Sequence, residues 1–234
     1  MTTGFHTSAA GMVWTQKAID VTANNIANLS TQGYKEDQSS FADLLYTQIK
    51  PPQTDPALKV GHGSRLDKTD TIFTASGLDE TGRPQDYALT DSRTFFAVQT
   101  SDGRTIYTRG GNFSLSKGTD GRFTLVDSAG NQVLGADGNP IITTDLTQKQ
   151  NLGVYTFRDL DGLQKVSGGF EATDRSGAAY RVTDANVKQG YLEVSSADMA
   201  TEISNMIVQE RAYQLNAKMT VMTDEVMQTV NNLR

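Results

Sequence analysis

The sequence contains no cysteine, which excludes disulfide bonds and thiolate metal sites. It carries 21 basic residues against 27 acidic ones, and the basic residues form no run. Nucleic-acid binding needs a basic surface that replaces counterions, so this charge balance argues against it. No apolar stretch approaches the roughly 18 residues that a membrane-spanning helix needs. We therefore expect neither nucleic-acid binding nor membrane insertion.

The first residues, Met1–His6, contain neither the basic segment nor the apolar core of a secretory signal peptide, so we expect no cleavable signal. The absence of cysteine is compatible with a reducing cytoplasm and with export by a route that needs no disulfide. At 37% hydrophobic and 21% charged residues, the composition is typical of a folded protein with one large domain or two small ones.

Both ends of the chain carry mostly apolar residues at alternating spacings of four and three. An average of 3.5 residues places each set on one narrow stripe of a helix, as in coiled coils. These helices should pair with each other, with other copies of the chain, or with both. The N-terminal stripe consists of Phe5, Ala9, Met12, Gln16, Ile19, Ala23 and Ile26, and the C-terminal stripe of Met199, Ile203, Met206, Glu210, Tyr213, Ala217, Thr220, Asp224 and Met227.

The two predicted helices have recognisable ends. The first should span about 7–28 and end at Asn28–Tyr34, where polar side chains compete for backbone hydrogen bonds and Gly33 permits a positive φ. The second should begin near Ser195, which forms a capping-box pattern with Asp198. No proline or glycine interrupts the sequence from there to residue 232.

The segment 36–70 fits two structures. Its first part, to residue 50, suits either a second short helix or an extended arm, and Pro51–Pro52 would end both. The remainder is poor in large apolar groups. We expect an extended linker that lies on a neighbouring surface.

The middle of the chain, 71–188, is predicted to be an antiparallel β-domain. Short apolar and aromatic runs alternate with Asp-Gly pairs, which are typical of type I′ hairpin turns. No helical period separates the runs, which argues against a βαβ fold. The pairs are Asp102–Gly103, Asp120–Gly121, Asp137–Gly138 and Asp161–Gly162.

The whole chain is thus predicted to have an α+β fold in four parts. Helices within 1–35 and 189–234 would form an antiparallel coiled-coil-like domain. The linker 36–70 and the central β-rich domain 71–188 would stand between them.

The sequence offers little chemistry. His62 and Ser64 share a loop, but the G-x-S-x-G pattern is absent. Asp159–Gly162 resembles only the opening of a calcium loop, and a hairpin turn explains it better. We predict no catalytic, cofactor or metal site. The enzymatic alternative is a secreted β-domain that binds or cuts cell-wall polysaccharide, for which Asp86 and Asp91 would have to lie about 5 to 9 Å apart.

Three blocks of the sequence resemble the bacterial flagellar rod and hook proteins. Ala23–Lys35 is similar to the N-terminal signature of that family, Asp86–Leu89 with Phe95–Val98 and Tyr107–Phe113 to its central β-domain, and Gln189–Glu193 with Gln209–Gln214 to its C-terminal signature. One departure is Asp91–Thr94, where family members commonly have glycines. The signature residues are Asn24, Asn25, Asn28, Gly33, Tyr34, Gly190, Tyr191, Arg211, Ala212 and Tyr213.

This resemblance implies an axial protein of the flagellar basal body. Such proteins leave through the flagellar type III export apparatus, uncleaved and unfolded, and polymerise helically into a hollow rod that transmits torque from motor to hook. The implied partners are other copies of the chain, other rod and hook proteins, and the export apparatus. The implied arrangement places the terminal helices inside and the β-domain outside. Phe41–Tyr46 resembles the distal-rod branch, and a proximal-rod or adaptor protein of the same family is the alternative.

Overall fold

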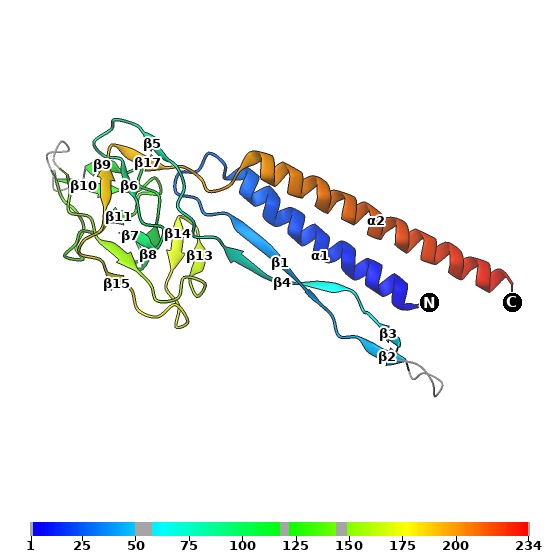
Figure 1. Cartoon of the computed structure of the whole chain (residues 1–234). Helices are drawn as coiled ribbons and strands as arrows, with labels where there is room; N and C mark the ends of the chain where they lie inside the picture. Colours follow the sequence, from blue (N-terminus) through cyan, green and yellow to red (C-terminus); the bar gives the residue numbers. More distant parts are fainter. Residues whose placement is uncertain (1, 50–57, 118–121, 144–148, 234) are drawn as a thin grey trace. The chain divides into compact units, whose positions relative to one another are not determined.

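The computed structural model describes residues 2–49, 58–117, 122–143 and 149–233, which divide into two compact units. The helical unit comprises the described residues of 1–27, 37–70 and 198–234, and the β-unit those of 28–36 and 71–197. Figure 1 shows the elements of both. The division groups 28–36 with the β-rich residues and 37–70 with the helices, whereas the sequence suggests boundaries at 35, 70 and 188.

The helical unit contains α1 (Thr2–Ala27) and α2 (Met199–Asn232). The N-cap of α2 is Asp198, whose carboxylate accepts hydrogen bonds from the backbone N–H and the hydroxyl of Thr201, at 2.9 and 2.8 Å. The predicted start at Ser195 is therefore wrong by three residues. The short Asp198 side chain satisfies the free N–H groups of the first turn, so the helix begins directly after it.

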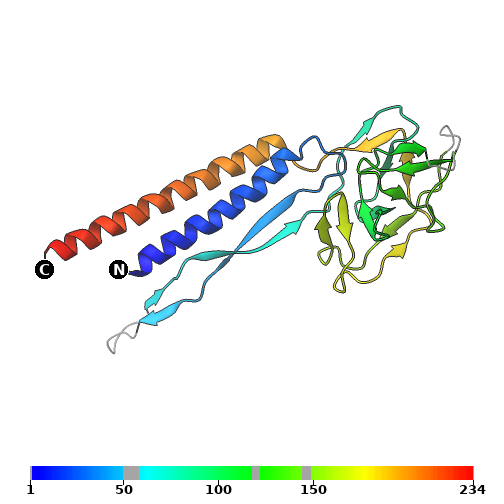
Figure 2. The same ribbon diagram turned by 180° about the vertical axis from the view of Figure 1, so that it is seen from behind.

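The two helices lie side by side and antiparallel, as both ribbon views show (Figure 1, Figure 2). Asn25 near the end of α1 contacts Glu202 near the start of α2, whereas Gly4 lies opposite Thr223. With 34 residues against 26, α2 continues past the point where α1 begins. Among the described residues, neither helix combines the length and apolar character that crossing a membrane requires.

The described residues of 37–70 form a two-stranded ribbon, which excludes the second short helix and leaves the extended arm. Strand β1 (Asp37–Asp43) pairs with β4 (Ser64–Thr71), and β2 (Thr47–Ile49) pairs antiparallel with β3 (Leu58–Val60). Pro51 and Pro52 lie outside the described residues. The pairing within the segment was not predicted, because it joins short polar strands far apart in the sequence.

Asn25 fastens the ribbon to α1. Its amide nitrogen donates to the carbonyl of Asp37 at 2.8 Å, and its amide oxygen accepts from the N–H of the same residue at 3.0 Å. The side chain thus pairs with the first residue of β1 as a neighbouring strand would.

The β-unit is built on a nine-stranded sheet with the order β13-β14-β8-β7-β11-β10-β9, in which β12 pairs with β7 and β15. Two smaller sheets pair β16 with β6 and β17 with β5. The bounds are β5 Leu78–Glu80, β6 Tyr87–Leu89, β7 Thr94–Gln99, β8 Thr105–Thr108, β9 Ser114–Lys117, β10 Phe123–Val126, β11 Gln132–Val133, β12 Val154–Thr156, β13 Gln164–Val166, β14 Gly169–Glu171, β15 Tyr180–Arg181, β16 Val187–Gln189 and β17 Tyr191–Glu193. Antiparallel pairs join these strands, so the predicted hairpin-rich β-structure is confirmed.

Two apolar clusters form the core of the β-unit. Strand β7 supplies both, because its successive side chains point to opposite faces of the sheet. Phe96 and Val98 join the larger cluster, and Phe95 joins the smaller one with Phe157 and Phe170. The larger cluster also contains Tyr87, Leu89, Ile106, Phe113, Leu125, Val133, Leu152 and Val154.

The Asp-Gly turns are not of type I′. That type needs a positive φ at both central residues, but among the described residues only glycines have one. Gly103 and Gly138 each have a φ of 78°, which fits a type I turn followed by one left-handed glycine. Neither residue of Asp161–Gly162 has a positive φ, and Asp120–Gly121 lies outside the described residues.

Candidate assembly surface and the buried ion cluster

Small and polar residues form the face of α1 that packs against α2. A Cβ atom added at Gly11 would lie 2.8 Å from the Asn216 side chain, so the backbone is close to the opposite helix there. The Thr22 hydroxyl donates to the Gln209 side-chain oxygen at 3.1 Å. The buried or helix-facing positions repeat the 4-3 spacing; this small-residue stripe consists of Gly4, Ser8, Gly11, Thr15, Ala18, Thr22 and Asn25.

The predicted N-terminal stripe stands one residue later at every position. One residue turns an α-helix by about 100°, so the N-terminal stripe lies beside the contact with α2 rather than in it. Phe5 is 41% exposed, and Gln16 and Ala23 are also exposed. The other members, Ala9, Met12, Ile19 and Ile26, are half-buried. The sequence left open whether the helices pair within one chain or between copies. The contact within one chain uses the small-residue stripe of α1 instead of the predicted N-terminal stripe.

On α2 the predicted stripe overlaps the intrachain contact only in part. Met206, Thr220 and Ala217 are half-buried. Met199, Ile203, Glu210, Tyr213, Asp224 and Met227 are exposed. The side facing α1 instead includes polar groups, such as the buried Glu202 carboxylate, which accepts from Asn25 at 3.0 Å.

The outward faces of α2 carry most of the large apolar side chains that lie exposed in the described chain. An apolar surface of this extent is typical of an interaction site. We call these residues, together with Phe5 and Val13 of α1, the apolar surface of the helices. On α2 they are Met199, Ile203, Ile207, Val208, Tyr213, Leu215, Met219, Val221, Met222, Val226, Met227 and Val230.

A buried ion cluster lies in the β-unit. The Glu193 carboxylate accepts from Lys35 Nζ at 2.7 Å through one oxygen, and from Arg109 Nε at 2.7 Å through the other. All three side chains are essentially inaccessible to water. One carboxylate therefore compensates two buried cations, each of which would be costly alone.

Further acceptors surround both cations. Arg109 Nη1 donates to the carbonyls of Asp91 and Thr94, at 2.8 and 2.7 Å. Lys35 Nζ also donates to the Thr74 carbonyl and to the Ser76 hydroxyl. Burial lowers the pKa of Lys35 from its usual value, and the hydrogen bond to Glu193 opposes that shift.

The turn Asp91–Thr94 replaces the glycines that the family commonly has there. The Asp91 carboxylate accepts from the N–H of Arg93 at 3.0 Å, and the Thr94 hydroxyl donates to the Asp91 carbonyl at 3.0 Å. Side-chain hydrogen bonds of this kind stabilise a turn without a left-handed residue. In this chain the turn aims the carbonyls of Asp91 and Thr94 at Arg109.

Gly33 permits a close approach next to the cluster. Its φ is 68°, and a Cβ there would lie 2.5 Å from the Arg109 carbonyl carbon, so no other residue fits without a shift. Its N–H donates to the Glu193 carbonyl at 2.8 Å. Tyr34 accepts from the N–H of Ser196 at 3.0 Å, and its ring lies under the Lys165 ammonium. Residues 33–34 and 193–196 are thus held side by side within the β-unit.

The other signature residues divide between the two units. Gly190 has a φ of 80° and accepts from the N–H of Thr81, which links β17 to β5. Asn28 and Tyr191 are half-buried in the β-unit. In the helical unit Asn25 is buried and Ala212 half-buried, whereas Asn24, Arg211 and Tyr213 are exposed.

Comparison with known proteins gives family matches at three places. Residues 5–35 match "Flagella basal body rod protein", residues 91–156 match "Flagellar hook protein FlgE/F/G D1 domain", and residues 188–233 match "Flagellar basal body rod FlgEFG protein C-terminal". The flagellar basal-body rod protein FlgG of Bacillus subtilis is 32% identical, with 100% of both chains covered. FlgG of Agrobacterium fabrum is 32% identical over 96% of each chain, and the flagellar hook-basal body complex protein FlhP of B. subtilis 25% over 94%.

The chain belongs to the flagellar basal-body rod family. As a member of that family it is a structural protein of the flagellum and not an enzyme. The α+β fold agrees with the fold that the resemblance implies. Association with copies of itself and with other rod and hook proteins follows from the family.

Each of the three matched segments contributes one member of the buried ion cluster of this rod protein. Lys35 ends the first segment, Arg109 lies in the second and Glu193 in the third. Sequence reasoning quoted all three within its motifs but predicted none as a site. A signal was available, because each of the three blocks contains a tyrosine, a glycine and a charged residue within a few positions, with two basic residues and one acidic residue in total.

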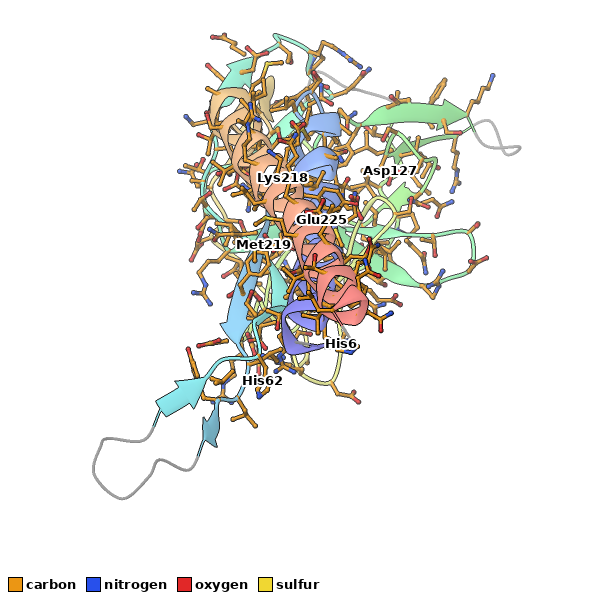
Figure 3. All side chains as sticks on the ribbon, turned by 90° about the vertical axis from the view of Figure 1, so that its right-hand side faces the viewer. His6, His62, Asp127, Lys218, Met219 and Glu225 are labelled. Carbon is orange, nitrogen blue, oxygen red and sulfur yellow. The ribbon has the colours of Figure 1, made fainter. Side chains whose placement is uncertain are left out.

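The candidate residues for other chemistry are distributed over several elements of the described chain. Asp86 is buried and accepts from the Thr81 hydroxyl at 2.6 Å, and Asp91 bonds within its own turn. Figure 3 places His6 on α1 and His62 at the ribbon. Asp159 accepts from the N–H of Asp161 within its turn. The part of the chain that the structure describes holds no group of three or more potential metal ligands.

Proposed function

We propose that copies of this rod protein polymerise helically into the basal-body rod, which transmits torque from motor to hook. The observation that supports this is the placement of large apolar side chains on the outside of α2, while polar and small residues occupy the contact between the helices. A chain that finishes its fold alone does the reverse. Contacts that repeat without closing generate an open helical filament.

The two faces of α1 suggest a division of roles. The small-residue stripe holds α1 to α2 within one chain, and the N-terminal stripe, with Phe5, Met12 and Ile19, contacts neighbouring copies. The apolar surface of α2 packs against the N-terminal stripe of a neighbouring copy in a coiled-coil-like manner. Burial stabilises such contacts by roughly 25 cal/mol per Å² of apolar area, so a modest area on each copy holds the polymer together.

The ribbon supplies a second contact between copies. Phe41, Leu45 and Tyr46 lie exposed on or next to β1, and Leu45 is 89% exposed. An exposed apolar patch on a two-stranded ribbon suits docking on a neighbouring copy. We assign the chain to the distal rod because Phe41–Tyr46 resembles that branch; a proximal-rod or rod–hook adaptor position is the alternative.

The proposal also concerns how the chain leaves the cytoplasm. The chain leaves the cytoplasm unfolded through the flagellar export apparatus, without cleavage of its N-terminus. Mass spectrometry of rods isolated from cells tests this: peptides that include Thr2–His6 are expected. Their consistent absence would contradict export without cleavage.

The substitution Ile203→Asp tests the polymerisation. It places a charge in the apolar surface of α2, where burial between copies would leave it unpaired. Electron microscopy of basal bodies should show no rod beyond the point where this protein joins, and near-UV circular dichroism should show a folded β-unit. Asn205→Asp is the matched control, because it adds the same charge at an exposed polar position of α2 and should leave rods intact.

A result in which Ile203→Asp and Asn205→Asp both form normal rods would exclude α2 as the contact between copies. Phe41→Asp and Leu45→Asp apply the same test to the ribbon. If rods are lost in Phe41→Asp or Leu45→Asp but form in Ile203→Asp, the main contact between copies lies on the ribbon and not on the helices.

A further inference from the structure

The seven methionines of this chain are segregated. All belong to the helical unit, and the β-unit contains neither methionine nor cysteine. Two stand in α1 or at its start, and five stand in α2, at positions 199, 206, 219, 222 and 227. Sulfur chemistry can therefore occur only in the unit that we assign to assembly.

Four of the α2 methionines are open to solvent in the single chain. Met199, Met219, Met222 and Met227 are 57, 50, 56 and 41% exposed. Met206 is half-buried on the side of α2 that faces α1. Figure 3 shows Met219 and Glu225 projecting from different sides of α2, so apolar and charged side chains are interspersed along its surface.

A peroxide oxidises such a thioether in one balanced step. With hydrogen peroxide, a sulfur lone pair attacks one peroxide oxygen, the S–O bond forms and the O–O bond breaks; the proton of the attacked oxygen passes to the departing hydroxide, which leaves as water. The sulfur is oxidised by two electrons and the peroxide is reduced. The product, methionine sulfoxide, is polar and disrupts apolar contacts, and thiol-dependent reductases convert it back.

We propose that Met199, Met219, Met222 and Met227 form a modification site for peroxides, and that their oxidation blocks assembly of the free chain. The proposal rests on the polymerisation proposed above, since that assembly would bury these side chains. Four sulfoxides would replace four exposed apolar side chains of α2 by polar S–O groups, which would have to be buried between copies. Copies already in the polymer would be protected, so the modification acts on subunits that have not yet joined.

The experiment compares the full chain before and after hydrogen peroxide. Peptide mass spectrometry should show the four exposed methionines oxidised faster than Met206. Sedimentation of polymer should show that the critical concentration rises about tenfold or more after treatment. The two methionine sulfoxide reductases, one for each sulfoxide epimer, should together restore it. The near-UV circular dichroism of the β-unit should stay unchanged, because that unit has no sulfur to oxidise.

Two variants assign the effect to residues. The fourfold variant Met199→Leu, Met219→Leu, Met222→Leu and Met227→Leu keeps the apolar volume and should polymerise equally well with and without peroxide. Met12→Leu is the matched control, which leaves the four sites in place and should stay sensitive.

The outcomes separate this proposal from the one on which it rests. If the untreated chain does not polymerise, both are wrong. If the untreated and the fully oxidised chains polymerise alike, only the oxidation proposal is wrong. The oxidation proposal is also wrong if peroxide still blocks assembly of the fourfold variant, or if the reductases do not restore assembly of the oxidised chain. In both cases the damage that blocks assembly would lie at other residues.

Discussion

The two units of this rod protein place their apolar and polar residues in opposite ways. In the β-unit the apolar side chains are inside, and even the buried ions Lys35, Arg109 and Glu193 find partners. In the helical unit small and polar residues make the contact between the helices, and most large apolar side chains of α2 are exposed. The β-unit thus forms a complete core within a single chain. In the helical unit, by contrast, the apolar surface of α2 remains exposed in the single chain.

The largest expected effect concerns the ion cluster. Glu193→Ala leaves Lys35 and Arg109 as two buried cations without a carboxylate, which should destabilise the β-unit by about 3 to 5 kcal/mol. Urea unfolding followed by near-UV circular dichroism measures this, since most tyrosines lie in the β-unit. The matched control is Glu80→Ala on the paired strand β5, an exposed residue whose loss should change stability by less than about 0.5 kcal/mol. Equal effects would mean that the cluster does not depend on its carboxylate.

Replacing one phenylalanine by alanine in each unit compares how much a buried and an exposed aromatic side chain contribute to stability. Phe96→Ala empties a fully buried position and should cost about 3 kcal/mol or more. Phe5→Ala removes a side chain that is 41% exposed and should cost the single chain less than about 1 kcal/mol. For assembly the order of the two effects should reverse: Phe5→Ala should reduce polymer formation more than Phe96→Ala does, because Phe5 belongs to the apolar surface of the helices. A large loss of stability in Phe5→Ala would show that the helical unit has a closed core of its own.

The sequence predicted the kinds of element better than their contacts. Terminal helices and antiparallel strands follow from periodicity and turn chemistry, both of which are local. The ion cluster could not be predicted in this way, because Lys35, Arg109 and Glu193 stand far apart and meet only in the folded chain. The pairing of β1 with β4 is non-local for the same reason.

The pairing face of α1 was missed for a different reason. Two stripes with the same 4-3 spacing run one residue apart, and the apolar one is the stronger sequence signal. The structure uses the other for the intrachain contact, because Gly11 lets the helices approach where a larger side chain such as Met12 would hold them apart. Periodicity identifies a face of a helix, but it does not identify the partner of that face.

A smaller effect should distinguish the two glycines of the small-residue stripe. Gly11→Ala gains helix propensity but forces a Cβ to within 2.8 Å of Asn216, so the helical unit should lose about 1 kcal/mol. Gly4→Ala meets only Thr223, at 3.9 Å, and should be neutral or slightly stabilising. The fluorescence of Trp14, the single tryptophan, reports the unfolding of this unit.

A second substitution checks the cause. Asn216→Ala on its own shortens the side chain that the new Cβ meets, and the combination with Gly11→Ala should recover the lost stability. If the double variant is as unstable as the sum of the two single ones, the helices are not in close contact at this point.

The smallest expected effect is a slope with pH in the β-unit. Because burial lowers the pKa of Lys35 below 10.5, the folded chain releases this proton at a lower pH than the unfolded chain. In the range between the two values the unfolded state binds more protons, so the free energy of unfolding contributed by Lys35 rises with pH. Lys35→Met removes that term, whereas the tyrosines that titrate in the same range are common to both proteins. The difference in free energy of unfolding, the unsubstituted chain minus Lys35→Met, should therefore increase as the pH approaches 10.5. A flat or falling difference would mean that Glu193 stabilises the charged lysine more than burial disfavours it.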